Sequence, residues 1–138
     1  MSMPESFQSR SFRLSLDLLK LYRVLRALVD LPRHFPDQML RAGTAIGANL
    51  AEAKSAYSRR DLAARYTISL RECRECHYWL LLIAADQPHL ADRLAEPIEE
   101  CNQIVAILTT TVRKLRIASM VAVAVAVGVL FLLLTSGL

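Results

Sequence analysis

The cysteines and a histidine near the middle of the chain have the spacing that most resembles a chemical site. Cys73-Arg74-Glu75-Cys76-His77 matches the C-x-x-C-H pattern, in which two thiols bond the vinyl groups of haem and the histidine ligates its iron. Such attachment takes place outside the cytoplasm, and we expect no cleaved secretory signal, because no N-terminal stretch joins basic residues to an apolar core and a small-residue cleavage site. Cys73 and His77 also fall on the core-facing side of a predicted helix. We therefore interpret the run as buried small residues and a packed histidine.

Zinc is the second metal that these side chains could hold. Cys101, together with Cys73, Cys76 and His77, would supply four ligands of the kind that zinc prefers. Structural zinc ligands usually lie on turns, whereas these lie inside helices, and the Glu-x-x-His pairs of di-iron bundles do not occur. The sequence also has no glycine-rich phosphate loop and no Ser/His/Asp grouping. We therefore expect no metal, no cofactor, no small-molecule substrate and no catalytic residue.

Arginine is the more informative residue type, because it outnumbers lysine by fourteen to three. Between Arg10 and Arg74 there are thirteen basic and six acidic side chains, whereas residues 86–100 have five acidic side chains and one arginine. Guanidinium groups favour bidentate contacts with phosphate. The candidates for binding an RNA or DNA backbone are Arg41, Arg59, Arg60, Arg65, Arg71 and Arg74. The same side chains would equally suit a solvated surface with ion pairs, or a surface that meets anionic lipid headgroups.

The elements that must position these side chains are predicted from the apolar residues, which recur every three or four positions in four segments. These segments are residues 12–31, 37–56, 58–85 and 97–116. Pro36-Asp37, a capping box at Ser58 and Pro97 mark helix starts. Because short turns separate the segments, we predict an all-α, antiparallel up-down four-helix bundle over residues 12–116. We expect residues 1–11 to form a flexible lead-in.

Small residues distinguish the second predicted helix. Gly43 and Gly47 lie inside it, and each glycine costs about 1 kcal/mol of helix stability relative to alanine. Close approach of a neighbouring helix would offset that cost.

The end of the sequence is an apolar tail with no charged residue from Ile117 to Leu138. As a helix, its 22 residues would extend about 33 Å, enough to cross a hydrocarbon core of about 30 Å. Arg113, Lys114 and Arg116 precede it, and the positive-inside rule would keep the bundle on the cytoplasmic side of the membrane. The alternative is a tail that folds back as a core helix. We predict a membrane anchor at residues 117–138, because Met120 to Leu134 has no polar side to turn toward water.

The stretch from Gln38 to Ile83 resembles the S23 ribosomal protein family, four-helix-bundle proteins encoded in intervening sequences of bacterial 23S rRNA genes. The resemblance is carried by "LRAGTAIGANLAEA" from Leu40 and by "ISLRECRECHYWLLLI" from Ile68. In the first run Asn49 and Glu52 match the family motif. In the second, a Glu-x-x-Glu-x-x-Tyr-Trp-Leu pattern includes Glu72, Glu75, Tyr78 and Trp79.

The resemblance implies a four-helix bundle without known catalytic activity that often assembles as a homopentamer. The fold is also similar to the accessory protein of diversity-generating retroelements, in which a basic pentamer binds nucleic acid and a reverse transcriptase. We interpret Asn49 and Glu52 as structural residues with partners on a neighbouring helix. Tyr78 and Trp79 suit either the core or a subunit contact.

Taken as a whole, the sequence predicts a non-enzymatic, homo-oligomeric bundle attached to the inner membrane by its tail. Its arginine-rich surface would bind RNA or DNA by neutralising phosphates rather than by reading bases. The alternative is a membrane-anchored protein-interaction scaffold with no nucleic-acid role.

Overall fold

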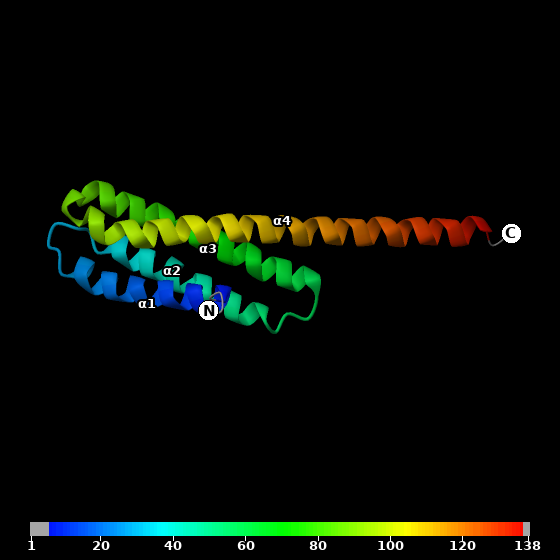
Figure 1. The fold of residues 1–138 in the computed structure, drawn as a ribbon, viewed down its shortest axis with the longest axis horizontal. Coiled ribbons are helices and arrows are strands. Elements are labelled where there is room, and N and C mark those ends of the chain that lie inside the picture. Colours follow the sequence, from blue (N-terminus) through cyan, green and yellow to red (C-terminus); the bar gives the residue numbers. More distant parts are fainter. Residues whose placement is uncertain (1–5, 137–138) are drawn as a thin grey trace, which may run out of the picture.

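The computed structural model describes residues 6–136, which form four α-helices and one 3-10 helix and contain no strand. The elements are α1 (Phe7–Arg26), α2 (His34–Ala53), α3 (Arg59–Asp86), η1 (Pro88–Leu90) and α4 (Ala91–Ser136). The connections alternate between the two ends of the bundle, and α4 continues far beyond the other helices (Figure 1). The predicted all-α, four-helix fold is confirmed. The apolar tail is the second half of α4 rather than a separate helix.

The first helix begins earlier than its apolar pattern indicated. Ser6 caps α1, because its hydroxyl accepts a hydrogen bond from the Ser9 backbone N–H at 3.1 Å. Residues 7–11, expected in a flexible lead-in, are therefore helical, and this expectation is corrected. The rest of that segment, residues 1–5, lies outside the described residues. The helix also ends at Arg26, before its predicted end at residue 31.

The predicted cap of α3 is present in a slightly different form. The Ser58 hydroxyl accepts from the Asp61 backbone N–H at 3.1 Å, as a capping box requires. The Asp61 carboxylate reaches back one residue further than expected and accepts from the Tyr57 N–H at 3.2 Å. Both bonds satisfy backbone donors near the start of α3, and they fix the connection between α2 and α3.

The start of α4 differs from the prediction. Pro97 was expected to open this helix, but α4 begins at Ala91, and Pro88 occupies the first turn of the 3-10 helix that leads into it. Pro97 lies within α4, where it is buried. It lacks the N–H that would bond to the Arg93 carbonyl. The helix nevertheless continues through the proline.

The core is a single apolar cluster to which all four helices contribute. Its fully buried large side chains include Leu18 on α1, Ile46 on α2, Leu80 on α3 and Leu108 on α4. On α3 the buried side is turned slightly from the predicted one. Cys76 and Ile83 are fully buried, whereas His77, which was predicted to face the core, is only half-buried.

The glycines of α2 lie where neighbouring helices approach. A Cβ atom added to Gly43 would be 2.1 Å from Leu18 Cδ1 and 3.2 Å from Cys76 Sγ. At Gly47 the nearest atom would be Ser15 Oγ at 3.4 Å, followed by the Ser11 carbonyl oxygen at 3.5 Å, which are ordinary contacts. The expected close approach is therefore present at both positions, but only Gly43 has no room for a methyl group.

Gly43→Ala is expected to lower the free energy of unfolding by about 1–3 kcal/mol, because Leu18 would have to leave its packed position. Gly47→Ala is the matched control, and it should leave stability unchanged or raise it by up to about 1 kcal/mol through helix propensity. Urea denaturation in mild detergent, followed by circular dichroism, would measure both. Equal effects of the two substitutions would contradict this packing.

The second half of α4 leaves the bundle without covering any of it. Val112 is the last buried residue of α4, and every residue from Met120 to Ser136 is exposed. The large apolar side chains from Met120 to Leu134 are between 50% and 72% exposed. Among the described helices, only the one containing this segment is long and apolar enough to cross a membrane, with a mean hydropathy of 2.9 over its most apolar window.

Candidate functional site

The three cysteines lie together in the core. The Cys73 thiol donates to the Cys101 carbonyl oxygen at 3.4 Å, and the sulfur atoms of Cys76 and Cys101 are 3.9 Å apart. All three are unbonded and buried, while His77 is half-buried. The contact of Cys73 with Cys101 and the burial of Cys73 raise the pKa of its thiol, which stays protonated at neutral pH. Among residues 6–136, no cluster of His, Cys, Asp or Glu is arranged to hold a metal ion.

The family-motif residues of α3 surround one of the candidate arginines. Arg41, on α2, contacts Glu72 at 3.4 Å and forms a second ion pair with Glu75. The Trp79 indole N–H also points at Glu75, with its nitrogen 3.4 Å from a carboxylate oxygen. The hydrogen bond from Arg41 holds the pKa of the Glu75 carboxyl below its usual range. Arg41 therefore joins α2 to α3, and two carboxylates balance its charge.

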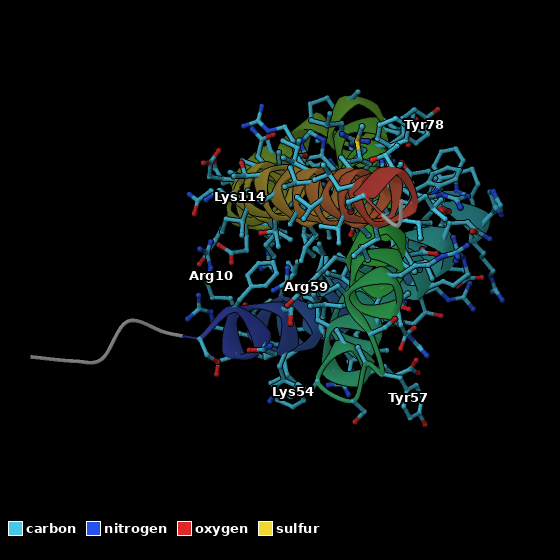
Figure 2. The ribbon with its side chains drawn as sticks, turned by 90° about the vertical axis from the view of Figure 1, so that its right-hand side faces the viewer. Arg10, Lys54, Tyr57, Arg59, Tyr78 and Lys114 are labelled. Carbon is cyan, nitrogen blue, oxygen red and sulfur yellow. The ribbon has the colours of Figure 1, made fainter. Side chains whose placement is uncertain are left out.

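The aromatic pair that follows these glutamates divides between the core edge and the surface. Trp79 is half-buried, with its ring 5.3 Å from that of His34 and 5.7 Å from that of Phe35 at the start of α2. Tyr78 is 58% exposed and points outward (Figure 2). Trp79 therefore packs within the chain, whereas Tyr78 is available to a partner.

A second α2–α3 connection involves the other motif residues. Arg65 on α3 forms an ion pair with Glu52 on α2 and approaches Asp61 on its own helix at 3.5 Å. The partner expected for Glu52 on a neighbouring helix is thus present. Asn49 instead donates its side-chain amide to the Ala45 carbonyl of its own helix at 2.9 Å. Arg65, like Arg41, has its charge balanced by carboxylates.

Arg59 and Arg60 are exposed at the start of α3. They adjoin the α2–α3 connection, from which Lys54 and Tyr57 project outward (Figure 2). This connection lies at the end of the bundle from which the second half of α4 departs (Figure 1). Tyr57 is 97% exposed. We call the surface formed by Lys54, Tyr57, Arg59 and Arg60 the basic end.

The last two candidates, Arg71 and Arg74, lie in a groove between α3 and α4. Its volume is about 360 Å³, and α4 adds two arginines to it. Its lining is Thr67, Leu70, Arg71, Arg74, Thr109, Val112, Arg113, Arg116 and Ile117, which we call the arginine groove. The fold therefore separates the six sequence candidates: two bridge α2 and α3, two belong to the basic end, and two join arginines that the sequence associated only with the tail.

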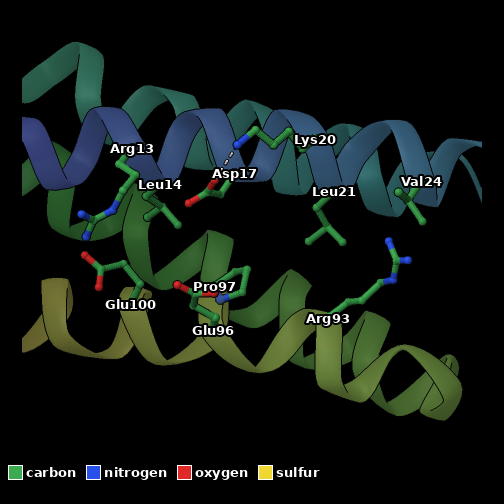
Figure 3. A pocket seen from close by; sticks show the side chains of 10 residues that line it. All are labelled: Arg13, Leu14, Asp17, Lys20, Leu21, Val24, Arg93, Glu96, Pro97 and Glu100. Carbon is green, nitrogen blue, oxygen red and sulfur yellow. Dashed lines mark hydrogen bonds and ion pairs between the residues drawn. The ribbon is translucent and has the colours of Figure 1, made fainter.

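A third region is a pocket between α1 and α4 that is lined by both basic and acidic side chains. These two helices contact each other less than the adjacent helix pairs do. The volume of the pocket is about 260 Å³ (Figure 3). The charged side chains that line it are Arg13, Lys20, Arg93, Asp17, Glu96 and Glu100. Arg13 points toward Glu100, and Lys20 pairs with Asp17 at 3.3 Å. Because its charges balance, this pocket has no preference for an anion or a cation.

These features define a four-helix-bundle protein with a long apolar extension and clustered arginines. The chain belongs to the family of 23S rRNA-intervening sequence proteins, whose family model matches residues 7–110. It is similar to a solved protein of unknown function from the S23 ribosomal protein family of Bacteroides thetaiotaomicron, with 28% identity and a TM-score of 0.67. The similarity covers 76% of this chain and 96% of that one. No match to a curated protein was found. The family match ends before the apolar half of α4.

Proposed function

We propose that this chain is a non-enzymatic, membrane-anchored bundle protein that associates with copies of itself on the cytoplasmic side of the membrane. The observation that carries the proposal is the second half of α4. It is uncharged, helical and exposed along its length from Met120 to Ser136. Helix geometry gives residues 117–136 a length of about 30 Å, which matches the hydrocarbon core of a bilayer. Apolar surface of this extent is unfavourable in water and favourable in lipid.

The distribution of charge supports the same orientation. Arg113, Lys114 and Arg116 directly precede the apolar half of α4. The basic end lies at the same end of the bundle (Figure 1). Basic side chains are retained on the cytoplasmic side, and tyrosine is enriched at the membrane interface. A bundle held above the bilayer by α4 would thus turn its basic end, including Tyr57, toward the lipid headgroups.

Cell fractionation followed by carbonate extraction tests the anchor. The full chain should stay in the membrane pellet after alkaline carbonate, because a spanning helix is not held by charge. Recovery of the folded chain in the carbonate supernatant would overturn the proposal.

Self-association is supported by an uncovered apolar groove between α1 and α2. The groove has a volume of about 590 Å³, and its floor includes the small residues Gly47, Ala48 and Ala51. Phe12 lines its edge and is 66% exposed. A helix of a second copy could approach closely over such small residues and cover Phe12.

Light scattering of the detergent-solubilised chain tests this contact. Ala48→Glu should reduce the number of protomers per particle, because it would place a charge in the groove. Ala106→Glu, on an exposed position of α4 outside the groove, is the matched control. A monomeric wild type, or equal behaviour of the two variants, would overturn self-association through this groove.

Nucleic-acid binding is the second candidate function. It is favoured by the exposed Arg59 and Arg60, which form no ion pair within the described part of the chain. The family is named after an intervening sequence of 23S rRNA. Titration of the detergent-solubilised full chain with RNA at several salt concentrations tests it. Binding that weakens steeply with salt, and weakens further in Arg59→Gln plus Arg60→Gln, would support it. Negligible RNA binding would overturn this second candidate function, and the membrane-anchored scaffold would remain as the proposed function.

A further inference from the structure

The arginine groove contains four guanidinium groups and no acidic side chain in its lining. Arg71 and Arg74 are three residues apart on α3, and Arg113 and Arg116 are three apart on α4, so each pair projects from one side of its helix. None of the four forms an ion pair among residues 6–136. This separates the groove from Arg41 and the other arginines that bridge helices.

The nearest family-motif carboxylates are already engaged elsewhere. Glu72 and Glu75 lie beside Arg71 and Arg74 in the sequence, but both pair with Arg41 on α2. Arg71 also helps to lower the pKa of the Glu75 carboxyl, so this carboxylate offsets part of the charge of the groove, but the four guanidinium groups leave the groove with an excess of positive charge. A bound anion would balance this excess charge, and guanidinium groups bind phosphate oxygens in bidentate fashion. The volume of about 360 Å³ is within the usual range for small-molecule sites.

The position of the groove indicates which phosphate it would bind. Its lining ends at Ile117, the first residue of the uncharged part of α4, and Ile117 is 53% exposed. Leu70 and Val112 provide apolar walls beside the arginines. An anionic lipid combines the same two features, a phosphodiester next to an apolar chain. A nucleic acid would leave these apolar surfaces without a matching partner.

We propose that the arginine groove binds the phosphodiester of an anionic membrane lipid, whose acyl chains continue along the apolar half of α4 from Ile117. The proposal rests on the membrane anchor proposed above. Arg71 and Arg74 would contact the phosphate from α3, while Arg113 and Arg116 contact it from α4. The lipid would thus hold α3 and α4 together at the point where α4 leaves the bundle.

Native mass spectrometry of the full chain in neutral detergent, with equal amounts of phosphatidylglycerol and phosphatidylcholine, tests the site. The wild type should retain phosphatidylglycerol preferentially. Arg71→Gln plus Arg74→Gln should reduce that retention by at least about tenfold, since each basic residue near a membrane surface contributes about fivefold to anionic-lipid affinity. Retention of phosphatidylcholine should not change.

The matched control is Arg23→Gln plus Arg33→Gln, which removes the same charge from exposed positions in or near the α1–α2 connection, and this connection lies at the other end of the bundle (Figure 1). This control should keep the lipid preference. Equal retention of the two lipids by the wild type, or equal losses in both double variants, would overturn the proposal. Displacement of the lipid by millimolar inorganic phosphate would show a free-phosphate site instead. RNA binding lost in Arg71→Gln plus Arg74→Gln, with lipid retention unchanged, would assign the groove to nucleic acid.

Carbonate extraction of the same variants separates this proposal from the anchor. A chain that stays in the membrane without preferring phosphatidylglycerol would contradict the lipid site alone. A chain released from the membrane would contradict the anchor.

Discussion

Val125→Arg plus Val129→Arg is expected to move most of the protein from the membrane pellet to the soluble or aggregated fraction. Both valines lie in the exposed apolar half of α4, at 60% and 50% exposure. An arginine near the centre of a membrane helix costs about 2.5–3.5 kcal/mol on insertion scales, so the pair would oppose insertion by roughly 5–7 kcal/mol. Immunoblotting of carbonate-treated membranes would measure the distribution.

Val125→Leu plus Val129→Leu is the control for this prediction, because it changes the same positions without adding charge. It should remain in the pellet like the wild type. The bundle should stay folded in both variants, because neither valine contacts the core. An unchanged membrane fraction in the arginine variant would show that the tail is not held within lipid.

Leu80→Ala is expected to be the most destabilising single substitution among those considered, at about 2–5 kcal/mol. Leu80 is fully buried in the cluster formed by the four helices. Leu81, the next residue of α3, is 46% exposed, so Leu81→Ala makes the same chemical change and should cost less than about 1 kcal/mol. Urea denaturation in detergent, followed by circular dichroism, compares the two.

This pair of adjacent substitutions tests the orientation of α3 as well as its burial. If Leu81→Ala were as costly as Leu80→Ala, the buried side of α3 would be different from the one described. A small effect of Leu80→Ala would also contradict the described orientation of α3, because it would show that truncating the Leu80 side chain leaves no cavity in the core.

Much of the fold could be predicted from the sequence because its signals are local. Recurring apolar residues identified the four helices, and the Ser58 cap located the start of α3 to within a residue. The glycines of α2 indicated a close helix approach, which is present at Gly43. Boundaries were less predictable where several signals competed. Pro97 was expected to start α4, but the helix begins at Ala91 and accommodates Pro97 as a buried residue despite the missing backbone hydrogen bond.

The candidate site was less predictable, because it depends on which helices lie side by side. Arg41 and Arg74 have the same residue type and both are exposed, yet one pairs with Glu72 and Glu75 while the other lines the arginine groove. The sequence placed Arg113 with the tail, and only the packing of α4 against α3 brings it to Arg71. The one available signal was the repeated Arg-x-x-Arg spacing on two helices, which becomes informative once their contact is known.

The central claim, that the apolar half of α4 spans a membrane, can be tested by measuring the depth of a tryptophan in the bilayer. Val127→Trp and Ile117→Trp would each be made in a Trp79→Phe background and reconstituted with lipids brominated at different acyl positions. Because residue 127 lies near the middle of the segment, we expect its strongest quenching from bromines near the bilayer centre. Residue 117 should be quenched mainly by shallow bromines. Shallow or absent quenching at residue 127 would contradict the membrane-spanning role of this helix.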